Sequence, residues 1–239
     1  MSEEHKKYYD NLLGSSEGAT ELPADLTTPH ACEKSAELYR PIDLESVEQF
    51  CREHPVTPAH LTLAATLYVF SRFTGNEELY ISTVSSGRSN IRIQNTFGMF
   101  VNTLPLAAKV TDVSVLDFIK DVSERFDEAM RHEHYPFARI ASDYGYTPEL
   151  AFAYQLGMVT RYMQNGHEVS VESLEGGAPK FRLIVRIEIH DGQPSIVTEY
   201  DDGQYSESLV SQLTESIANV LKAFINQPQA RLFNVSLLS

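Results

Sequence analysis

The chain has 239 residues with 33 acidic and 19 basic side chains, which gives a formal net charge of −14. Such a protein repels phosphate backbones and anionic lipid, so nucleic acid and membrane surfaces are not expected partners. No apolar run approaches the roughly 20 residues of a membrane span, and no apolar segment follows the charged start, so we expect no signal peptide. Two cysteines, Cys32 and Cys51, fit reduced thiols in a cytoplasmic protein.

The N-terminal part of the chain is predicted to be mostly helical. The spacing of apolar residues predicts a helix at 3–13, a polar crossing segment at 15–28, a strand at 36–40 and helices at 44–53 and 58–73. Thr57 is a typical N-cap and Pro58 a typical first helical residue. The helix that they begin has almost no polar side, so we expect it to be buried.

The remainder of the chain interleaves strands and helices without a regular period. We predict strands at 79–84, 99–108, 150–159, 168–171, 181–189 and 195–200, and helices at 114–130, 136–145 and 206–225. Asp191-Gly192 is a strong hairpin signal between the last two strands. The pattern indicates an α/β fold, a two-layer sandwich with helices packed on a mixed β-sheet.

Few residues form a recognisable catalytic pattern. His132 and His134 are two positions apart at the end of a predicted helix, where side chains point apart, so we expect no metal site. His190 precedes the predicted turn and is interpreted as an exposed turn residue. A serine-nucleophile elbow, a phosphate-binding loop and a dinucleotide fingerprint are all absent from the sequence.

The segment from Gly98 to Leu106 is unusual because Asn102 and Thr103 interrupt an otherwise apolar predicted strand. Buried polar groups need hydrogen-bond partners. These two side chains are therefore either satisfied inside the fold or exposed to a cavity, and the residues alone leave both interpretations open.

This segment, Gly-Met-Phe-Val-Asn-Thr-Leu-Pro-Leu, resembles a core motif of the condensation domains of nonribosomal peptide synthetases. Gly87-Arg88 after a strand and the run from His132 to Phe137 are similar to further family motifs. The family motif that the run from His132 to Phe137 resembles is usually His-Gln-Asp-Tyr-Pro-Phe, so Glu133-His134 departs from it. Another departure lies at 143–150, where the family's two arginines are missing. The resemblance covers nearly the whole chain.

The resemblance implies a chloramphenicol-acetyltransferase-like lobe, specifically the C-terminal lobe of a condensation domain. It implies an entry helix and crossing segment at 1–28 and the α/β lobe at 29–239. In this family two lobes form a V, and the active site lies in the tunnel between them. The catalytic histidine belongs to a His-His-x-x-x-Asp-Gly motif of the N-terminal lobe, which is missing here. We therefore expect no catalytic residue in this chain and no activity from the chain alone.

The implied function is to form part of a catalyst that joins aminoacyl or peptidyl thioesters carried on proteins. The implied partners are the N-terminal lobe of the same domain, peptidyl carrier proteins and an adjacent adenylation domain. No cofactor is expected to bind directly, because the phosphopantetheine arms of the carrier proteins bring the substrates. The alternatives are a non-catalytic module that docks carrier proteins and a divergent stand-alone acyltransferase. An isolated lobe is expected to expose an apolar patch where its partner docks.

The resemblance also implies roles for individual residues. The residues implied to line the substrate tunnel are Asn102, Thr103, Met99 and Ser86. Those implied to maintain the motif structure are Gly87, Arg88, Gly98, Phe100, His134, Pro136 and Phe137. Purely structural roles are the alternative for the four tunnel residues.

Overall fold

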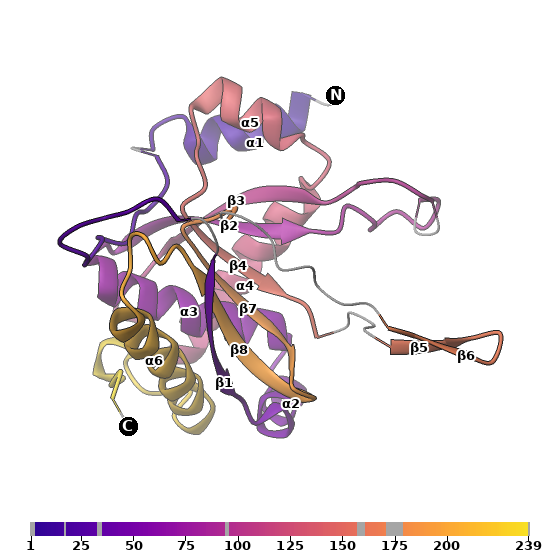
Figure 1. The fold of residues 1–239 in the computed structure, drawn as a ribbon. Helices are drawn as coiled ribbons and strands as arrows, with labels where there is room; N and C mark the ends of the chain where they lie inside the picture. Colours follow the sequence, from indigo (N-terminus) through magenta and orange to yellow (C-terminus); the bar gives the residue numbers. More distant parts are fainter. Residues whose placement is uncertain are drawn as a thin grey trace.

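The computed structural model describes residues 3–16, 18–32, 35–93, 96–156, 161–170 and 179–238. Its main feature is a six-stranded mixed sheet with the order β1-β8-β7-β4-β2-β3 (Figure 1). The strands are Ala36–Pro41 (β1), Glu78–Ser85 (β2), Asn102–Lys109 (β3), Leu150–Tyr154 (β4), Leu183–His190 (β7) and Gln193–Tyr200 (β8). β4 is parallel to both of its neighbours, and the other pairs are antiparallel. The predicted α/β sandwich with a mixed sheet is confirmed.

One face of the sheet carries the main hydrophobic core. It is covered by α2 (Leu44–Glu53), α3 (Pro58–Thr74), α4 (Val115–Arg131) and α6 (Glu207–Asn226). α3 packs against both α4 and α6, and every residue from His60 to Ser71 is buried, as its lack of a polar side predicts. Thr57 caps this helix by accepting a hydrogen bond from the backbone N–H of His60, which confirms the predicted start.

A smaller cluster lies on the opposite face, over the β2–β3 end of the sheet. There α1 (Glu3–Leu13) and α5 (Phe137–Tyr144) lie together (Figure 1). The buried members of this cluster are Tyr9, Leu13, Tyr135, Ile140 and Tyr146, with Tyr80 of β2 packed against them. Because residues alternate faces along a strand, Tyr80 points away from the main core that Leu79 and Ile81 enter. This cluster brings residues 132–137 next to the start of the chain.

β5 (Arg161–Gln164) and β6 (His167–Ser170) form a separate hairpin that projects from the body (Figure 1). Asn165 and Gly166 make its turn, with φ values of 51° and 81°. Asn-Gly is a strong hairpin signal, although only a strand at 168–171 was expected here from the sequence. Residue 171 lies outside the described residues.

Other predicted boundaries differ from the structure. β3 begins at Asn102 rather than at 99, because its partner strand β2 ends at Ser85, opposite Asn102. β4 ends at Tyr154, and residues 157–159 of the predicted strand lie outside the described residues. Phe181 does not share the core of Leu183 but packs with Ala151 and Ala153 on the other face.

The Asp191-Gly192 hairpin is confirmed, with φ values of 49° and 77°. The chain finishes with a short 3-10 helix at Leu232–Asn234. Within the described ranges, no helix is long and apolar enough to cross a membrane.

Candidate functional site

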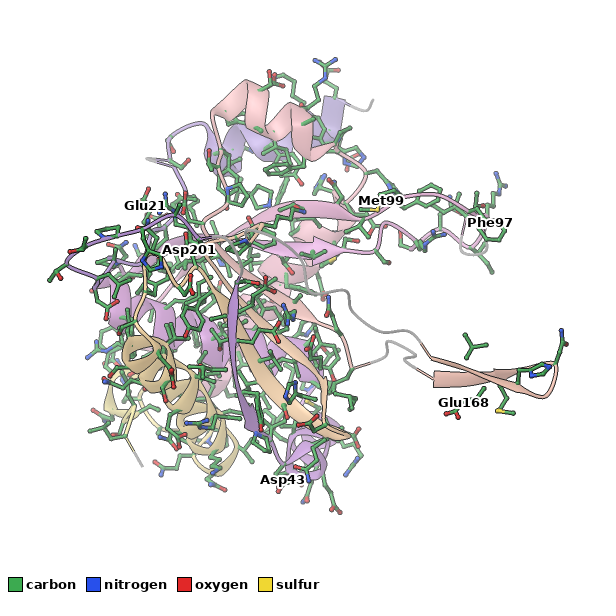
Figure 2. All side chains as sticks on the ribbon, in the orientation of Figure 1. Glu21, Asp43, Phe97, Met99, Glu168 and Asp201 are labelled. Carbon is green, nitrogen blue, oxygen red and sulfur yellow. The ribbon has the colours of Figure 1, made fainter. Side chains whose placement is uncertain are left out.

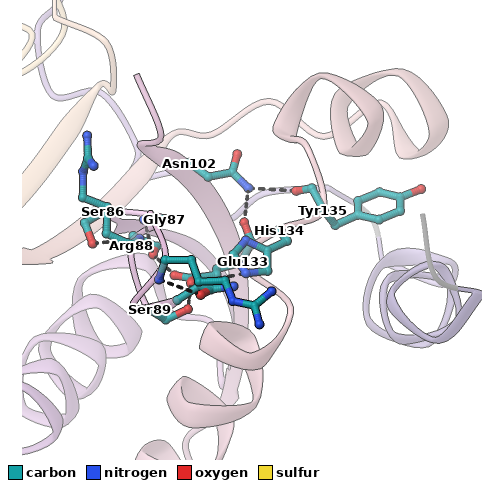
Figure 3. A network of polar contacts seen from close by, with 11 residues as sticks. Ser86, Gly87, Arg88, Ser89, Asn102, Glu133, His134 and Tyr135 are labelled. Carbon is teal, nitrogen blue, oxygen red and sulfur yellow. Dashed lines mark hydrogen bonds and ion pairs between the residues drawn. The ribbon is translucent and has the colours of Figure 1, made fainter. Parts of the chain in front are cut away.

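The candidate site is built around Glu133, a buried carboxylate that follows α4. It accepts a hydrogen bond from the hydroxyl group of Ser85, at the end of β2. It accepts another from Ser89, in the loop that follows (Figure 3). The exposed His134 pairs with the same carboxylate at 3.9 Å. Burial acts to raise the pKa of Glu133, but the two serines and His134 outweigh it and hold the pKa below its usual range. The carboxylate is therefore ionised at neutral pH.

The loop between β2 and β3 starts with a tight turn at Gly87. Its backbone N–H donates to Ser85 Oγ at 3.0 Å, so the serine hydroxyl links the turn to Glu133. Gly87 has a φ of 65°, and a Cβ at this position would lie 2.1 Å from the carbonyl oxygen of Phe100. Only glycine fits there, so the structural role implied for Gly87 has a direct steric cause.

Arg88 holds the rest of the loop together. Its Nη1 donates to the carbonyl oxygens of Ile93 and Thr96 at 2.9 and 2.8 Å. Its Nη2 donates to the carbonyl of Gly98 at 3.0 Å, and the guanidinium carbon lies 4.6 Å from the ring centroid of Phe100. A planar guanidinium can bind several carbonyl groups at once, which explains why a single side chain organises so long an excursion.

Asn102 joins β3 to the segment that carries Glu133. Its Nδ2 donates to the carbonyl oxygens of Glu133 and Tyr135, both at 2.8 Å (Figure 3). Its Oδ1 accepts from the backbone N–H of Phe137 at 3.1 Å. The side chain is thus fully used in main-chain bonds, which fits the structural interpretation. Its implied place in a substrate tunnel stays a prediction.

Thr103 faces the other side of β3, because adjacent strand residues point to opposite faces. It is buried, and its hydroxyl oxygen accepts a hydrogen bond from Lys180 Nζ at 3.1 Å. Lys180 also lies 5.3 Å from the ring centroid of Phe181. Lys180 carries no sequence signal for this role, since a lone lysine in a predicted loop belongs to no pattern.

The remaining residues of the prediction lie close to this network. Ser86 is exposed, and its Oγ is 3.4 Å from the backbone nitrogen of Arg88, as in an ordinary turn. Gly98 has a φ of 148°, and a Cβ at this position would lie 3.1 Å from the Phe100 ring. Pro136 is the N-cap residue of α5, and Phe137 packs against the smaller cluster around Tyr9 and Tyr135. The structure therefore brings the β2–β3 loop and residues 132–137 together, although 31 residues separate Asn102 from Glu133.

An apolar tip forms the outer part of the loop. We use this name for four exposed residues: Ile91, Phe97, Met99 and Val101. Phe97 and Met99 are 103% and 86% exposed, and Figure 2 shows both on the projecting loop. Met99, implied to line a tunnel, therefore contacts little within the described chain. Large apolar side chains gathered in this way mark an interaction surface.

His132 lies on the far side of the network and is buried. Its Nδ1 is 2.7 Å from Nδ1 of His5, its Nε2 is 3.1 Å from Glu128 Oε1, and its ring stacks on Tyr8 at 4.1 Å. Burial, with help from His132, lowers the pKa of His5. His132 and His134 diverge as predicted, the first toward α1 and the second toward solvent. His132 therefore anchors α1 to the end of α4.

The chemistry of this network is that of a structural joint. Ser85 and Ser89 donate to a carboxylate whose pKa is below its usual range, so the carboxylate is a weak base and neither hydroxyl is activated. Among the described residues, the only group of three or more potential metal ligands is Cys32, Asp201 and Asp202, which lies elsewhere. What the region offers is a shaped and rigidly held surface.

The comparisons with known proteins agree on one family. The family model described as "Condensation domain" matches residues 1–239. Tyrocidine synthase 3 of Brevibacillus parabrevis is 24% identical over 251 residues, which cover 99% of this chain and 4% of the relative. Surfactin synthase subunit 2 of Bacillus subtilis is 22% identical over 250 residues, covering 99% of this chain and 7% of the relative. The chain thus spans less than a tenth of the length of these curated relatives.

Solved structures show the same fold at low sequence identity. A four-domain nonribosomal peptide synthetase bound to AMP and glycine gives a TM-score of 0.85 at 15% identity, covering 98% of this chain and 20% of that one. The condensation domain of the monacolin K polyketide synthase gives 0.78 at 18%, covering 96% of this chain and 58% of that one. The first condensation domain of the calcium-dependent antibiotic synthetase gives 0.79 at 19%, covering 99% and 54%.

Proposed function

We propose that this chain, which belongs to the condensation-domain family, is the C-terminal lobe of a two-lobed catalyst for peptide bond formation in nonribosomal peptide synthesis. In this reaction the acceptor amine attacks the donor thioester carbonyl, the carbon–sulfur bond breaks, and the thiol of the donor's phosphopantetheine arm leaves. The amine proton passes to a base. We assign that base to the histidine of the N-terminal lobe, and the present chain supplies one wall of the tunnel.

The observation that carries this proposal is the apolar tip. Its four side chains are exposed on a loop that Arg88 and Glu133 hold in one shape, so the tip is an ordered surface without a covering within the described residues. The β5–β6 hairpin extends from the body on the same side in Figure 1 and carries the exposed Met163. A hairpin of two short strands is marginally stable by itself. Both projections are explained if a second lobe packs against them.

The extent of the structural matches supports the same proposal. The chain aligns over almost its whole length with solved condensation domains, yet it covers only 58% and 54% of two of them. That share fits one lobe of two. With Asn102 occupied in main-chain bonds, Thr103 and Lys180 are the better candidates among the described polar groups for contact with substrate arms, because they lie on the opposite face of β3 from the main core.

The test is an amide-formation assay with one carrier protein loaded as donor and one as acceptor. Three samples are assayed: this chain alone, a separately produced N-terminal lobe that carries the His-His-x-x-x-Asp-Gly motif, and the two together. We expect product only when both lobes are present. Product from this chain alone would overturn the proposal. Carrier binding without product under any condition would support the docking-module alternative instead.

A further inference from the structure

We propose that Glu133 is a positioning residue for the β2–β3 loop: it fixes the loop's first turn and thereby sets where the apolar tip is presented. The inference goes beyond the proposed function and names the residue that shapes the lobe–lobe contact surface, so its role in docking rests on that function. Its role in ordering the loop does not.

Among the described side chains, only Glu133 accepts hydrogen bonds from both Ser85 and Ser89. Ser85 lies before the turn and Ser89 after it, so one carboxylate closes the turn from both sides. Ser85 is also bonded to the N–H of Gly87 at 3.0 Å. Three points of the turn are therefore linked to a group that is 6% exposed.

The backbone of Glu133 is fixed by hydrogen bonds to β3 and to the end of α4. The carbonyl of its own backbone accepts a hydrogen bond from Asn102 at 2.8 Å, and its N–H donates to the carbonyl of Met130 at 3.2 Å at the end of α4. The main chain that carries the carboxylate therefore has a fixed position relative to β3 and α4. Arg88 then binds three backbone carbonyl groups of the outer loop. Because these contacts lie within the loop, the orientation of the loop on the body depends on the Gly87 turn that Glu133 binds.

Glu133 is one of the positions at which this chain departs from the motif that it resembles. The resembling family motif usually has Gln where Glu133 stands, and Asp where His134 stands. Here a carboxylate is buried beside two hydroxyl donors, and Nε2 of His134 lies 3.9 Å from its Oε1. A glutamate can accept hydrogen bonds from both serines, one on each carboxylate oxygen. A glutamine has an NH2 group in place of one oxygen, so one serine would have to accept a hydrogen bond instead of donating it.

The experiment uses the complete chain with a reporter on the tip. The sequence has no tryptophan, so Phe97→Trp provides a single emission signal at the exposed end of the loop. Into this background we would introduce Glu133→Ala, Glu133→Gln and the double change Ser85→Ala with Ser89→Ala. Glu124→Ala, an exposed glutamate on the neighbouring helix α4, removes the same charge and is the control. Fluorescence anisotropy and amide hydrogen exchange are measured for each.

We expect Glu133→Ala and the double serine variant to lower the anisotropy and to speed amide exchange in the loop by about tenfold, while the core strands keep their protection. Glu133→Gln should restore most of the order, and Glu124→Ala should match the parent. Unchanged loop exchange in Glu133→Ala would overturn the inference. So would exchange that rises equally in the loop and in β7, since that is the mark of a general loss of stability.

Binding to the N-terminal lobe separates this inference from the proposed function. It is measured with chains that keep Phe97. If the parent binds and Glu133→Ala binds about tenfold more weakly, presentation of the tip is supported. If the parent does not bind at all while the loop still responds to Glu133→Ala, the lobe assignment fails and the ordering role of Glu133 is upheld.

Discussion

Asn102 on β3 caps helix α5 from outside, because its Oδ1 accepts a hydrogen bond from the backbone N–H of Phe137 at 3.1 Å. The helix has Pro136 as its N-cap residue, which has no side-chain donor or acceptor for this role. The same Asn102 amide binds two carbonyl groups of the preceding segment. A strand residue therefore fixes the start of a helix and the segment that carries Glu133.

Replacing Asn102 should destabilise the whole fold. Asn102→Ala leaves one N–H and two carbonyl groups without this partner, so we expect the free energy of unfolding to fall by about 2–3 kcal/mol in a urea titration. Asn219→Ala is the control, since Asn219 makes a single bond to the carbonyl of Leu237 at 3.3 Å. Asn102→Asp should cost at least as much as Ala, because a carboxylate would face two carbonyl oxygens. An Asn102→Ala loss no larger than that of Asn219→Ala would contradict the capping role.

Arg88 should control the loop without controlling the fold. Arg88→Lys keeps the charge but provides one compact ammonium in place of a planar fork, so most of the carbonyl bonds are lost. We expect faster chymotrypsin cleavage after Phe97 or Phe100 and a change in unfolding free energy of no more than about 0.5 kcal/mol. Arg92→Lys, an exposed arginine in the same loop, should cleave at the parent rate. Equal cleavage rates in the two variants would show that Arg88 does not order the loop.

Arg186 should stabilise the fold by separating three carboxylates on adjacent strands of the sheet. It pairs with Glu37, Glu188 and Glu199, which come from three adjacent strands, and its side chain is 15% exposed. Arg186→Met leaves three carboxylates facing one another, so we expect a loss of about 2–4 kcal/mol. The loss should shrink when Glu199→Gln is added and when salt is raised, because both reduce carboxylate repulsion. Strictly additive effects of the two substitutions would exclude this coupling.

Alkaline pH should destabilise the protein through its buried tyrosines. Burial raises the pKa of Tyr205 to about 12, against 10 for an ordinary tyrosine, and its hydroxyl donates to the carbonyl of Leu22 at 3.0 Å. Between these two values the unfolded chain has lost the proton and the folded chain keeps it. The unfolding free energy therefore falls as pH rises through this window, by up to about 2–3 kcal/mol for this residue.

Tyr205→Phe isolates that contribution. The variant should be less stable than the parent at pH 8, because the bond to Leu22 is lost, but it should lose less stability between pH 10 and pH 12. Tyr39→Phe, at a 45% exposed position, serves as the control. Parallel pH profiles for Tyr205→Phe and the parent would show that Tyr205 does not titrate differently on folding. Urea titrations at a series of pH values measure all three proteins.

The sequence predicted those features that depend on local pattern. The buried helix after Thr57 follows from its lack of a polar side, and the Asp191-Gly192 hairpin from the alternation around it. The Asn165-Gly166 hairpin had an equally clear signal, but its strands are too short to show alternation. Local pattern therefore located elements best where they are long.

The candidate site was less accessible from sequence because its contacts join distant segments. Nothing local indicates that Glu133 meets Ser85, that Asn102 caps α5, or that Lys180 meets Thr103. The resemblance placed Asn102 and Thr103 in one motif, whereas they lie on opposite faces of β3, because neighbouring strand residues alternate. The predicted strand implied this alternation, but it did not indicate which distant segment each side chain meets.

The apolar tip should drive association of the chain in the absence of a partner lobe. Phe97 and Met99 expose nearly all of their apolar surface, so covering them in a contact is favourable, while their removal changes little inside the fold. Phe97→Ser with Met99→Ser should shift the chain toward monomer in size-exclusion runs at rising concentration and alter the unfolding free energy by less than about 0.5 kcal/mol. Leu238→Ser, which removes an 81% exposed leucine that lies outside the apolar tip, should leave association unchanged. A parent chain that stays monomeric at every concentration, or one whose association responds equally to Leu238→Ser, would show that the tip is not the adhesive surface.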